Sequence, residues 1–154
     1  MYPSFSLWRN AFSDLGKTTT SPVAPIFNVG LALGGYMLAL AARAITNYLP
    51  QRLALYTTCF LLICVAVINE NYGPLHFYVS IAFFTALAIF TGIEATRGRS
   101  ILLWLGLSTA VSIWITHFAY SIPPGAAIPE AVSICVGYAA IARSIARTIT
   151  TYKH

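Results

Sequence analysis

Few side chains in this 154-residue sequence could do chemistry, and those few stand near the ends of long apolar stretches. His76 lies near the start of the uncharged run 73–93, and His117 lies near the end of the later run 101–120. Neutral imidazoles from two facing helices can bind a haem iron axially, and together with carboxylates they can hold zinc. His76 and His117 are therefore candidate ligands for a divalent metal or a haem.

Acidic, amide and hydroxyl side chains could join the histidines in one polar pocket. The candidate members are Asn10, Ser13, Asp14, Asn28, Glu70, His76, His117 and Glu130. Each also has a simpler explanation. Ser13 and Asp14 can bond to nearby backbone, the helix macrodipole favours a carboxylate at Glu130, and the histidines can bond to a neighbouring helix or to interfacial water. The residue types alone leave both explanations open.

These side chains must be positioned by membrane-spanning helices. The sequence is 58% hydrophobic and 8% charged, and its mean hydropathy is +0.73. A soluble domain carries about a quarter charged residues, so this chain could not cover its surface in water. The run 73–93 is long enough, at about 1.5 Å per residue, to cross a hydrocarbon core of about 30 Å. We predict an all-α integral membrane protein.

Four other stretches resemble this run. We predict a single transmembrane domain over residues 1–154, formed by a bundle of five helices at about 22–45, 53–69, 73–95, 100–120 and 128–148. The first of them contains Gly30, Gly34 and Gly35, and small residues at this spacing let helices approach closely in lipid. We expect this face to pack within the bundle, against a second copy of the chain or against another membrane subunit.

A short amphipathic helix is predicted ahead of the bundle. Phe5, Trp8, Phe12 and Leu15 recur at spacings of three, four and three residues, which places them on one helical face. The surrounding residues are too polar for a membrane span. A helix at about 4–15 that lies in the membrane interface, in contact with lipids, fits this pattern.

The basic residues predict the orientation of the bundle. Seven of them fall on one side, whereas Arg9 and Lys17 fall on the other. The seven are Arg43, Arg52, Arg97, Arg99, Arg143, Arg147 and Lys153. By the positive-inside rule, the C-terminus is cytoplasmic and the N-terminus outside, in a multi-pass protein of the cell membrane. Because the basic residues are scattered rather than clustered, we expect no nucleic-acid partner.

This orientation gathers the ionisable members of the candidate pocket on the outer side. They are Asp14, Glu70, His76, His117 and Glu130. An unpaired polar group that faces hydrocarbon is costly, so we expect one outward-opening pocket that contains His76, His117 and at least one of Asp14 and Glu130. Glu94 falls at the cytoplasmic end instead, where we expect an interfacial ion pair with Arg97 or Arg99.

The stretch 10–16, Asn-Ala-Phe-Ser-Asp-Leu-Gly, is followed after a short linker by Phe27-Asn28 and a glycine-rich segment. This pattern resembles a polytopic membrane family catalogued as domain of unknown function 998. Its members typically show Asn-x-x-Ser-Asp-Leu-Gly between their first two helices, and a histidine near the start of a later helix that His76 matches. The resemblance implies a six-helix-like bundle and supplies no established activity.

One feature departs from that family pattern. Its members usually have a full helix before the motif, whereas nine residues precede Asn10 here. The chain is therefore either a five-helix variant with an interfacial helix in that place or a chain that starts late.

Three kinds of function fit these observations. The first is an accessory, structural or lipid-binding membrane protein with an outward-facing polar pocket. The second is a metal-dependent membrane-embedded enzyme that acts on a lipid or isoprenoid headgroup, with a metal at His76 and His117 activating a water. The third is a haem-carrying redox subunit with both histidines as axial ligands. The sequence has no nucleophile elbow, phosphate-binding glycine loop or HExxH motif, and it does not decide whether the protein is an enzyme.

Overall fold

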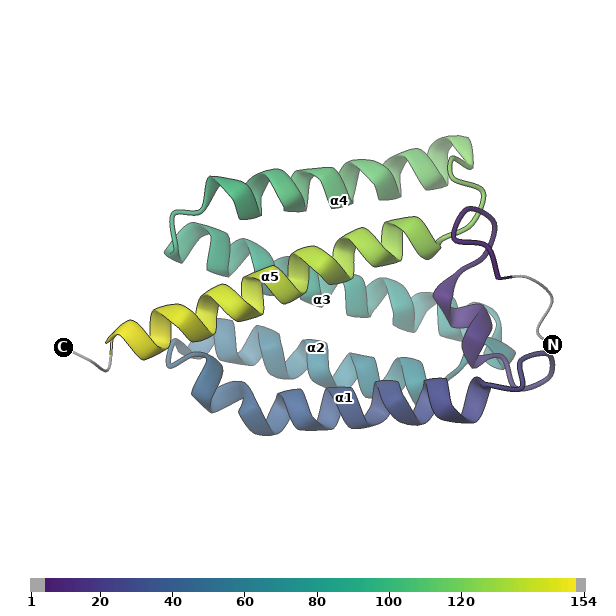
Figure 1. Ribbon diagram of the computed structural model, residues 1–154, viewed down its shortest axis with the longest axis horizontal. Coiled ribbons are helices and arrows are strands. Elements are labelled where there is room, and N and C mark those ends of the chain that lie inside the picture. Colours follow the sequence, from purple (N-terminus) through teal and green to yellow (C-terminus); the bar gives the residue numbers. More distant parts are fainter. Residues whose placement is uncertain (1–4, 152–154) are drawn as a thin grey trace.

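The computed structural model describes residues 5–151, and the long elements in that range are five α-helices. They run along the long axis of the molecule, with successive helices in opposite directions (Figure 1). Short 3-10 helices, η1 and η2, precede α1 and α3. The bounds are η1 Phe12–Gly16, α1 Ala24–Ile45, α2 Leu49–Val67, η2 Glu70–Tyr72, α3 Pro74–Arg97, α4 Ile101–Tyr120 and α5 Ala127–Thr151. Each α-helix in this range is long and apolar enough to cross a membrane, so the predicted all-α membrane bundle is confirmed.

Proline begins several of these helices. Pro25, Pro50 and Pro74 lie in the first turns of α1, α2 and α3, where the missing N–H removes no helical hydrogen bond. Gly73, immediately before α3, has a φ of +52°, a left-handed conformation that glycine adopts readily. At the start of α4, the hydroxyl of Ser100 accepts a hydrogen bond from the backbone N–H three residues on, at 3.4 Å.

Helix α2 begins at Leu49, four residues before the predicted start at 53. The predicted helix left out Gln51 and Arg52, which are polar. In the structure, Pro50 occupies the first turn and Gln51 is fully buried inside the bundle. The polar side chain of Gln51 therefore belongs to the interior rather than to a loop.

The short amphipathic helix predicted at about 4–15 is not confirmed. Residues 7–9 form a turn, and a helix follows only at η1, while residue 4 lies outside the described residues. Side chains compete with helical backbone bonds here: Asn10 Oδ1 accepts a hydrogen bond from Ser6 N at 3.0 Å. In the same way, Asp14 Oδ2 accepts from Ala11 N at 3.1 Å. Such local bonds favour turns over a continuous helix.

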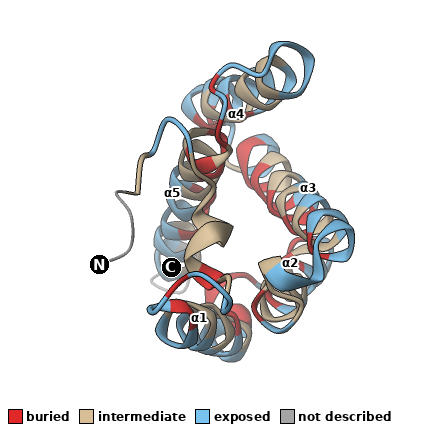
Figure 2. Cartoon of the chain, turned by 90° about the vertical axis from the view of Figure 1, so that its right-hand side faces the viewer, coloured by how far each residue is buried: buried red, intermediate tan, exposed pale blue. Residues whose placement is uncertain are grey.

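Residues 5–16, which we call the N-terminal segment, fold across one end of the bundle. The carbonyl of Trp8 accepts from Gly125 N at 3.0 Å, and the carbonyl of Asn10 accepts from Ala127 N at 2.9 Å. A Cβ on Gly125 would lie 2.3 Å from the backbone of Arg9, so only glycine allows this approach. Viewed from that end, η1 lies in front of the bundle interior, between α5 and α1 (Figure 2).

Helices that follow one another in the chain pack side by side, and α5 also packs against the earlier helices α3 and α1. α1 packs on α2 and α2 packs on α3, while α5 contacts α3, α4 and α1. α4 lies outermost, against α3 and α5 (Figure 2). The core between these helices includes Leu55, Cys59, Phe90, Ala140 and Ile141. Many large apolar side chains face outward instead, as helices in contact with lipid require.

The three glycines of α1 do not share one contact. A Cβ on Gly35 would lie 2.9 Å from the carbonyl oxygen of Cys59 and 2.9 Å from a side-chain carbon of Ile63, so α2 packs directly on this backbone. A Cβ on Gly30 or Gly34 would meet no described atom within 4 Å. The helix contact predicted for this face is therefore made by Gly35, while a face for a second copy at Gly30 and Gly34 stays a prediction.

Gly35→Ala and Gly34→Ala should consequently differ in their effect on stability. The methyl group added at position 35 would overlap the backbone of α2, so we expect the free energy of unfolding to fall by about 1–3 kcal/mol. At position 34 the methyl group enters open space, and the change should be neutral or slightly stabilising. Unfolding of both variants in mixed micelles of mild and denaturing detergent measures this. Equal losses would contradict the assigned packing.

Candidate functional site

A cavity of about 820 Å³ lies between α3, α4 and α5. Its walls include Phe77, Ile81, Val111, Ile115 and Phe118, which are also exposed on the outer surface of the bundle. These exposed side chains show that the cavity is open to the surroundings of the helices rather than enclosed.

Polar side chains gather at the end of this cavity beside η1. They come from the starts of α3 and α5, the end of α4, η2 and the N-terminal segment. They are Ser13, Glu70, His76, Ser80, His117, Glu130 and Ser133. At the other end, near Leu107, the hydroxyl of Thr91 donates to the carbonyl of Leu87 at 2.8 Å. That end consequently presents apolar groups to the cavity.

His76 is held by the turn between α2 and α3. Pro74 begins α3, which places His76 in the first turn, where 5% of the residue is exposed. Its Nδ1 lies 2.6 Å from the carbonyl oxygen of Ile68, just past the end of α2. Its Nε2 lies 3.3 Å from Ser80 Oγ and 3.3 Å from Glu70 Oε2. Both ring nitrogens are therefore engaged within the protein.

His117 occupies the matching position at the end of α4. Its Nδ1 lies 2.7 Å from the carbonyl oxygen of Pro123 in the turn before α5. Trp114, one turn earlier, donates from Nε1 to Ser133 Oγ at 3.0 Å and so joins α4 to α5. Among residues 5–151, Nε2 of His117 has no hydrogen-bond partner, so it is available to a molecule in the cavity.

Glu130 contributes a carboxylate from the first turn of α5, where the helix macrodipole favours negative charge. The residue is 8% exposed. Its Oε2 accepts a hydrogen bond from Phe12 N at 2.6 Å. This bond ties η1 to α5, and it positions Ser13 at the end of the cavity.

The other predicted pocket residues shape the N-terminal segment. Asp14 Oδ2 accepts a hydrogen bond from Asn10 Nδ2 at 2.9 Å, so these two side chains pair with each other. Asn28 Nδ2 donates to the carbonyl of Gly16 at 3.0 Å and ties η1 to α1. Asn10, Asp14 and Asn28 do not line the 820 Å³ cavity. Their role in the described structure is to fold residues 5–16 over the bundle end.

A smaller cavity of about 150 Å³ lies between α1, α2, α3 and α5. It is lined by Asn28 and by several residues that also line the larger one: Ser13, Glu70, His76, Ser80 and Glu130. These polar side chains therefore stand where the two cavities meet, under the N-terminal segment.

The donor set of the described residues does not supply a metal site with three or more protein ligands, whereas the two-histidine haem hypothesis stays a prediction. Within the described chain, no group of three or more His, Cys, Asp or Glu side chains could hold a metal ion. To bind iron through Nε2, His76 would have to give up its 3.3 Å contacts to Ser80 Oγ and Glu70 Oε2. We therefore derive no chemical step through a metal or a haem.

A second polar cluster lies inside the bundle at the opposite end. Glu94 on α3 is fully buried and forms an ion pair with Arg147 on α5, whose Nε donates to Glu94 Oε1 at 3.2 Å. Gln51 on α2 donates from Nε2 to Glu94 Oε2 at 2.7 Å. One carboxylate thus joins three helices.

This arrangement corrects the expected interfacial pair of Glu94 with Arg97 or Arg99. Arg97 instead donates to Gln51 Oε1 at 2.7 Å, and its guanidinium lies 4.1 Å from the ring centroid of Tyr48. Because α5 packs back on α3, Arg147 reaches Glu94 from a distant part of the sequence. A buried carboxylate needs such a partner.

Sequence reasoning missed this cluster. Ser144 Oγ accepts from Gln51 Nε2 at 3.2 Å and donates to the carbonyl of Ile45 at 3.0 Å. Thr148 Oγ1 donates to the same carbonyl at 2.9 Å. Ser144, Arg147 and Thr148 follow one another at helical spacing, so they lie on one face of α5. That polar stripe in an apolar helix was the signal that could have found the cluster.

These observations define the class of protein: a polytopic helical membrane protein whose bundle has an open cavity with most of its polar side chains at one end. The chain belongs to the family described as "Protein of unknown function (DUF998)", whose model matches residues 1–144. The family predicted from the sequence is thereby confirmed. No curated protein and no solved structure matches the chain.

Arg147→Met should destabilise the protein because it leaves Glu94 buried without its ion-pair partner. We expect a loss of about 3 kcal/mol, at the low end for breaking a buried pair, since 30% of the Arg147 side chain is exposed. The matched control is Arg143→Met. Arg143 is exposed, and its Nη2 donates a hydrogen bond to the carbonyl of Gly98 at 2.8 Å on the surface of the protein. Detergent unfolding measures both. Losses of equal size would show that the cluster does not stabilise the bundle.

Proposed function

We propose that this protein binds a membrane amphiphile in the cavity between α3, α4 and α5. The observation that supports the proposal is the distribution of polarity along the cavity. Most of its polar side chains stand at one end, beside η1, and its remaining walls are apolar apart from Thr85 and Thr91 of α3. An amphiphile has the same distribution, with a polar headgroup at one end of an apolar chain.

The dimensions of the cavity agree with this proposal. On α3, the lining residues extend from His76 to Thr91, which corresponds to roughly 22 Å at 1.5 Å per residue. The polar end lies at the end of the membrane-spanning helices, so in a bilayer it would lie near the lipid headgroups. The openness of the cavity to the surroundings of the helices would let a chain enter directly from the bilayer.

Binding, rather than catalysis, is the function that this geometry supports best. A metal-activated water would need several ligands in one place, and the described side chains do not supply them. The groups at the polar end can accept and donate hydrogen bonds to a headgroup without any further component. We therefore propose a lipid-binding accessory protein.

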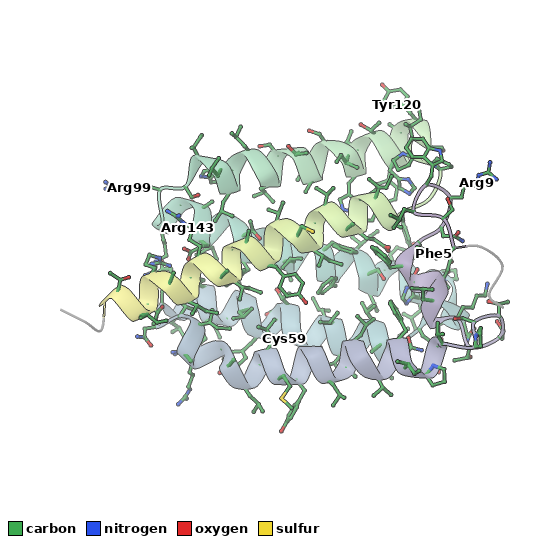
Figure 3. All side chains as sticks on the ribbon, viewed as in Figure 1. Phe5, Arg9, Cys59, Arg99, Tyr120 and Arg143 are labelled. Atoms are coloured by element: carbon green, nitrogen blue, oxygen red, sulfur yellow. The ribbon has the colours of Figure 1, made fainter. Side chains whose placement is uncertain are left out.

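We also propose that the protein lies in the cell membrane with η1 on the outer side and the C-terminal end of α5 in the cytoplasm. Figure 3 shows Arg99 and Arg143 at one end of the bundle, and Phe5, Arg9 and Tyr120 at the other. The excess of basic residues at the Arg99 end supports this orientation by the positive-inside rule.

Cysteine labelling in intact cells tests the orientation. In a background without the native cysteines, Thr19→Cys should react with a membrane-impermeant maleimide, because Thr19 is exposed beside η1. Thr96→Cys, exposed at the opposite end of α3, should react only after the cells are permeabilised. The reverse pattern would overturn the orientation and leave the cavity unaffected.

Quenching of Trp114 fluorescence tests amphiphile binding. Trp114 lines the cavity, so a long-chain alcohol brominated in its chain should quench it saturably in a protein that carries Trp8→Phe and Trp104→Phe. Ala110→Phe should abolish the saturable part, because Ala110 lines the cavity and the larger ring would fill it.

Two controls separate binding from partitioning into the detergent micelle. Thr109→Phe places the same ring on the exposed face of α4 and should leave quenching of Trp114 unchanged. A protein that keeps only Trp104, which is exposed, should show quenching that rises with the brominated fraction without saturation. If Trp114 behaved like Trp104, the cavity would not bind amphiphiles.

A further inference from the structure

We propose that the headgroup of the bound amphiphile is an amine that carries a positive charge, an inference that rests on the proposed function. Glu70 and Glu130 line the polar end of the cavity, together with His76 and His117. In the part of the chain that the structure describes, no lysine or arginine lines this cavity. The charged side chains that a headgroup would meet are therefore acidic.

Glu130 has one carboxylate oxygen that receives no hydrogen bond from the described residues. Its Oε2 is occupied by the backbone N–H of Phe12. Within residues 5–151, its Oε1 accepts no hydrogen bond, although the residue is more than nine-tenths buried and lines both cavities. This oxygen is not fully buried, because among the described residues only Ser21 Oγ is a buried polar side-chain atom without a partner. It therefore has surface open to the cavity, where an ammonium group would donate a charge-assisted hydrogen bond to it.

Glu70 supports the same headgroup from η2. Its side chain is 29% exposed, and its Oε2 lies 3.3 Å from Nε2 of His76. It lines the same two cavities as Glu130. An ammonium group has three N–H donors, so it can bond to more than one acceptor at this junction.

The basic residues at this end of the bundle do not change the charge of the site. Arg9 and Lys17 belong to the chain around η1, and neither lines the cavity. Figure 3 shows the side chain of Arg9 extending away from the bundle. A phosphate or carboxylate headgroup would consequently meet Glu70 and Glu130 without a cation to neutralise it, and like charges at close range repel.

Three amphiphiles with one chain and different headgroups test the inference. Hexadecylamine, hexadecanol and hexadecyl phosphate are each used to displace the brominated alcohol from the protein that keeps only Trp114, in a neutral detergent. We expect the amine to displace the probe at a concentration about tenfold lower than the alcohol, as charge-assisted hydrogen bonds would provide. The phosphate should be the weakest competitor.

Glu130→Gln should reduce the preference for the amine over the alcohol about tenfold, because glutamine keeps an acceptor for Phe12 N and loses the charge. Asp14→Asn is the matched control. It removes a carboxylate at the same end that pairs with Asn10 and does not line the cavity, so the preference should be retained.

The outcomes separate the two proposals. If the phosphate or the alcohol displaced the probe as well as the amine, the headgroup inference would be wrong while amphiphile binding would stand. A preference that survived Glu130→Gln would overturn the role of Glu130 in selecting the amine. If none of the three displaced the probe and the probe itself did not saturate, both proposals would fail.

Discussion

Hydrocarbon offers no hydrogen-bond partners, and this constraint decides where the polar side chains of the bundle lie. Glu94, Gln51 and Arg147 satisfy one another inside one end, so that α2, α3 and α5 are joined through charged and amide groups. At the other end, Glu130 and Asn28 hold the N-terminal segment against α5 and α1. Between the two ends, the helices contact one another almost entirely through apolar groups.

The position of the cavity is related to this separation of polar side chains at the two ends of the bundle from apolar contacts between them. α4 contacts α3 and α5 and contributes Leu103 to the core at one end, so space remains along the rest of its inner face. Small residues such as Ala88 and Ala110 line that space and leave it unfilled. The hydrogen bonds that hold the N-terminal segment also place Ser13 and Glu130 at the end of the cavity. The same contacts therefore close the bundle and make one end of the cavity polar.

The sequence predicted the helices well because length and hydropathy are local properties. Each predicted span corresponds to one of the α-helices in the described range, and the largest shift is at α2, where Gln51 is buried rather than in a loop. The amphipathic helix failed for a local reason as well. The rings of Phe5 and Phe12 do stack, with centroids 5.9 Å apart. The side chains of Asn10 and Asp14, however, accept hydrogen bonds from nearby backbone N–H groups, and these bonds favour turns over a continuous helix.

The site was partly predictable. His76, His117 and Glu130 were expected at one end because topology alone places helix ends at similar depth, and the structure places all three along one cavity. The pairing of Glu94 with Arg147 was not predictable in that way, since it depends on how α5 returns across α3. Sequence spacing also does not reveal that the neighbours Ser13 and Asp14 have different surroundings. Ser13 lines the cavity, whereas Asp14 accepts a hydrogen bond from Asn10.

We propose that the space between α3, α4 and α5 holds the chain of an amphiphile. Photocrosslinking tests it most directly, with a long-chain alcohol that carries a diazirine in its chain, protein in liposomes, and mass spectrometry to locate the attachment sites. We expect attachment to Phe84 and Leu87, which line the cavity; Leu87 is buried within the bundle. Attachment confined to outward-facing residues of α1, such as Ile26 and Leu40, would contradict it.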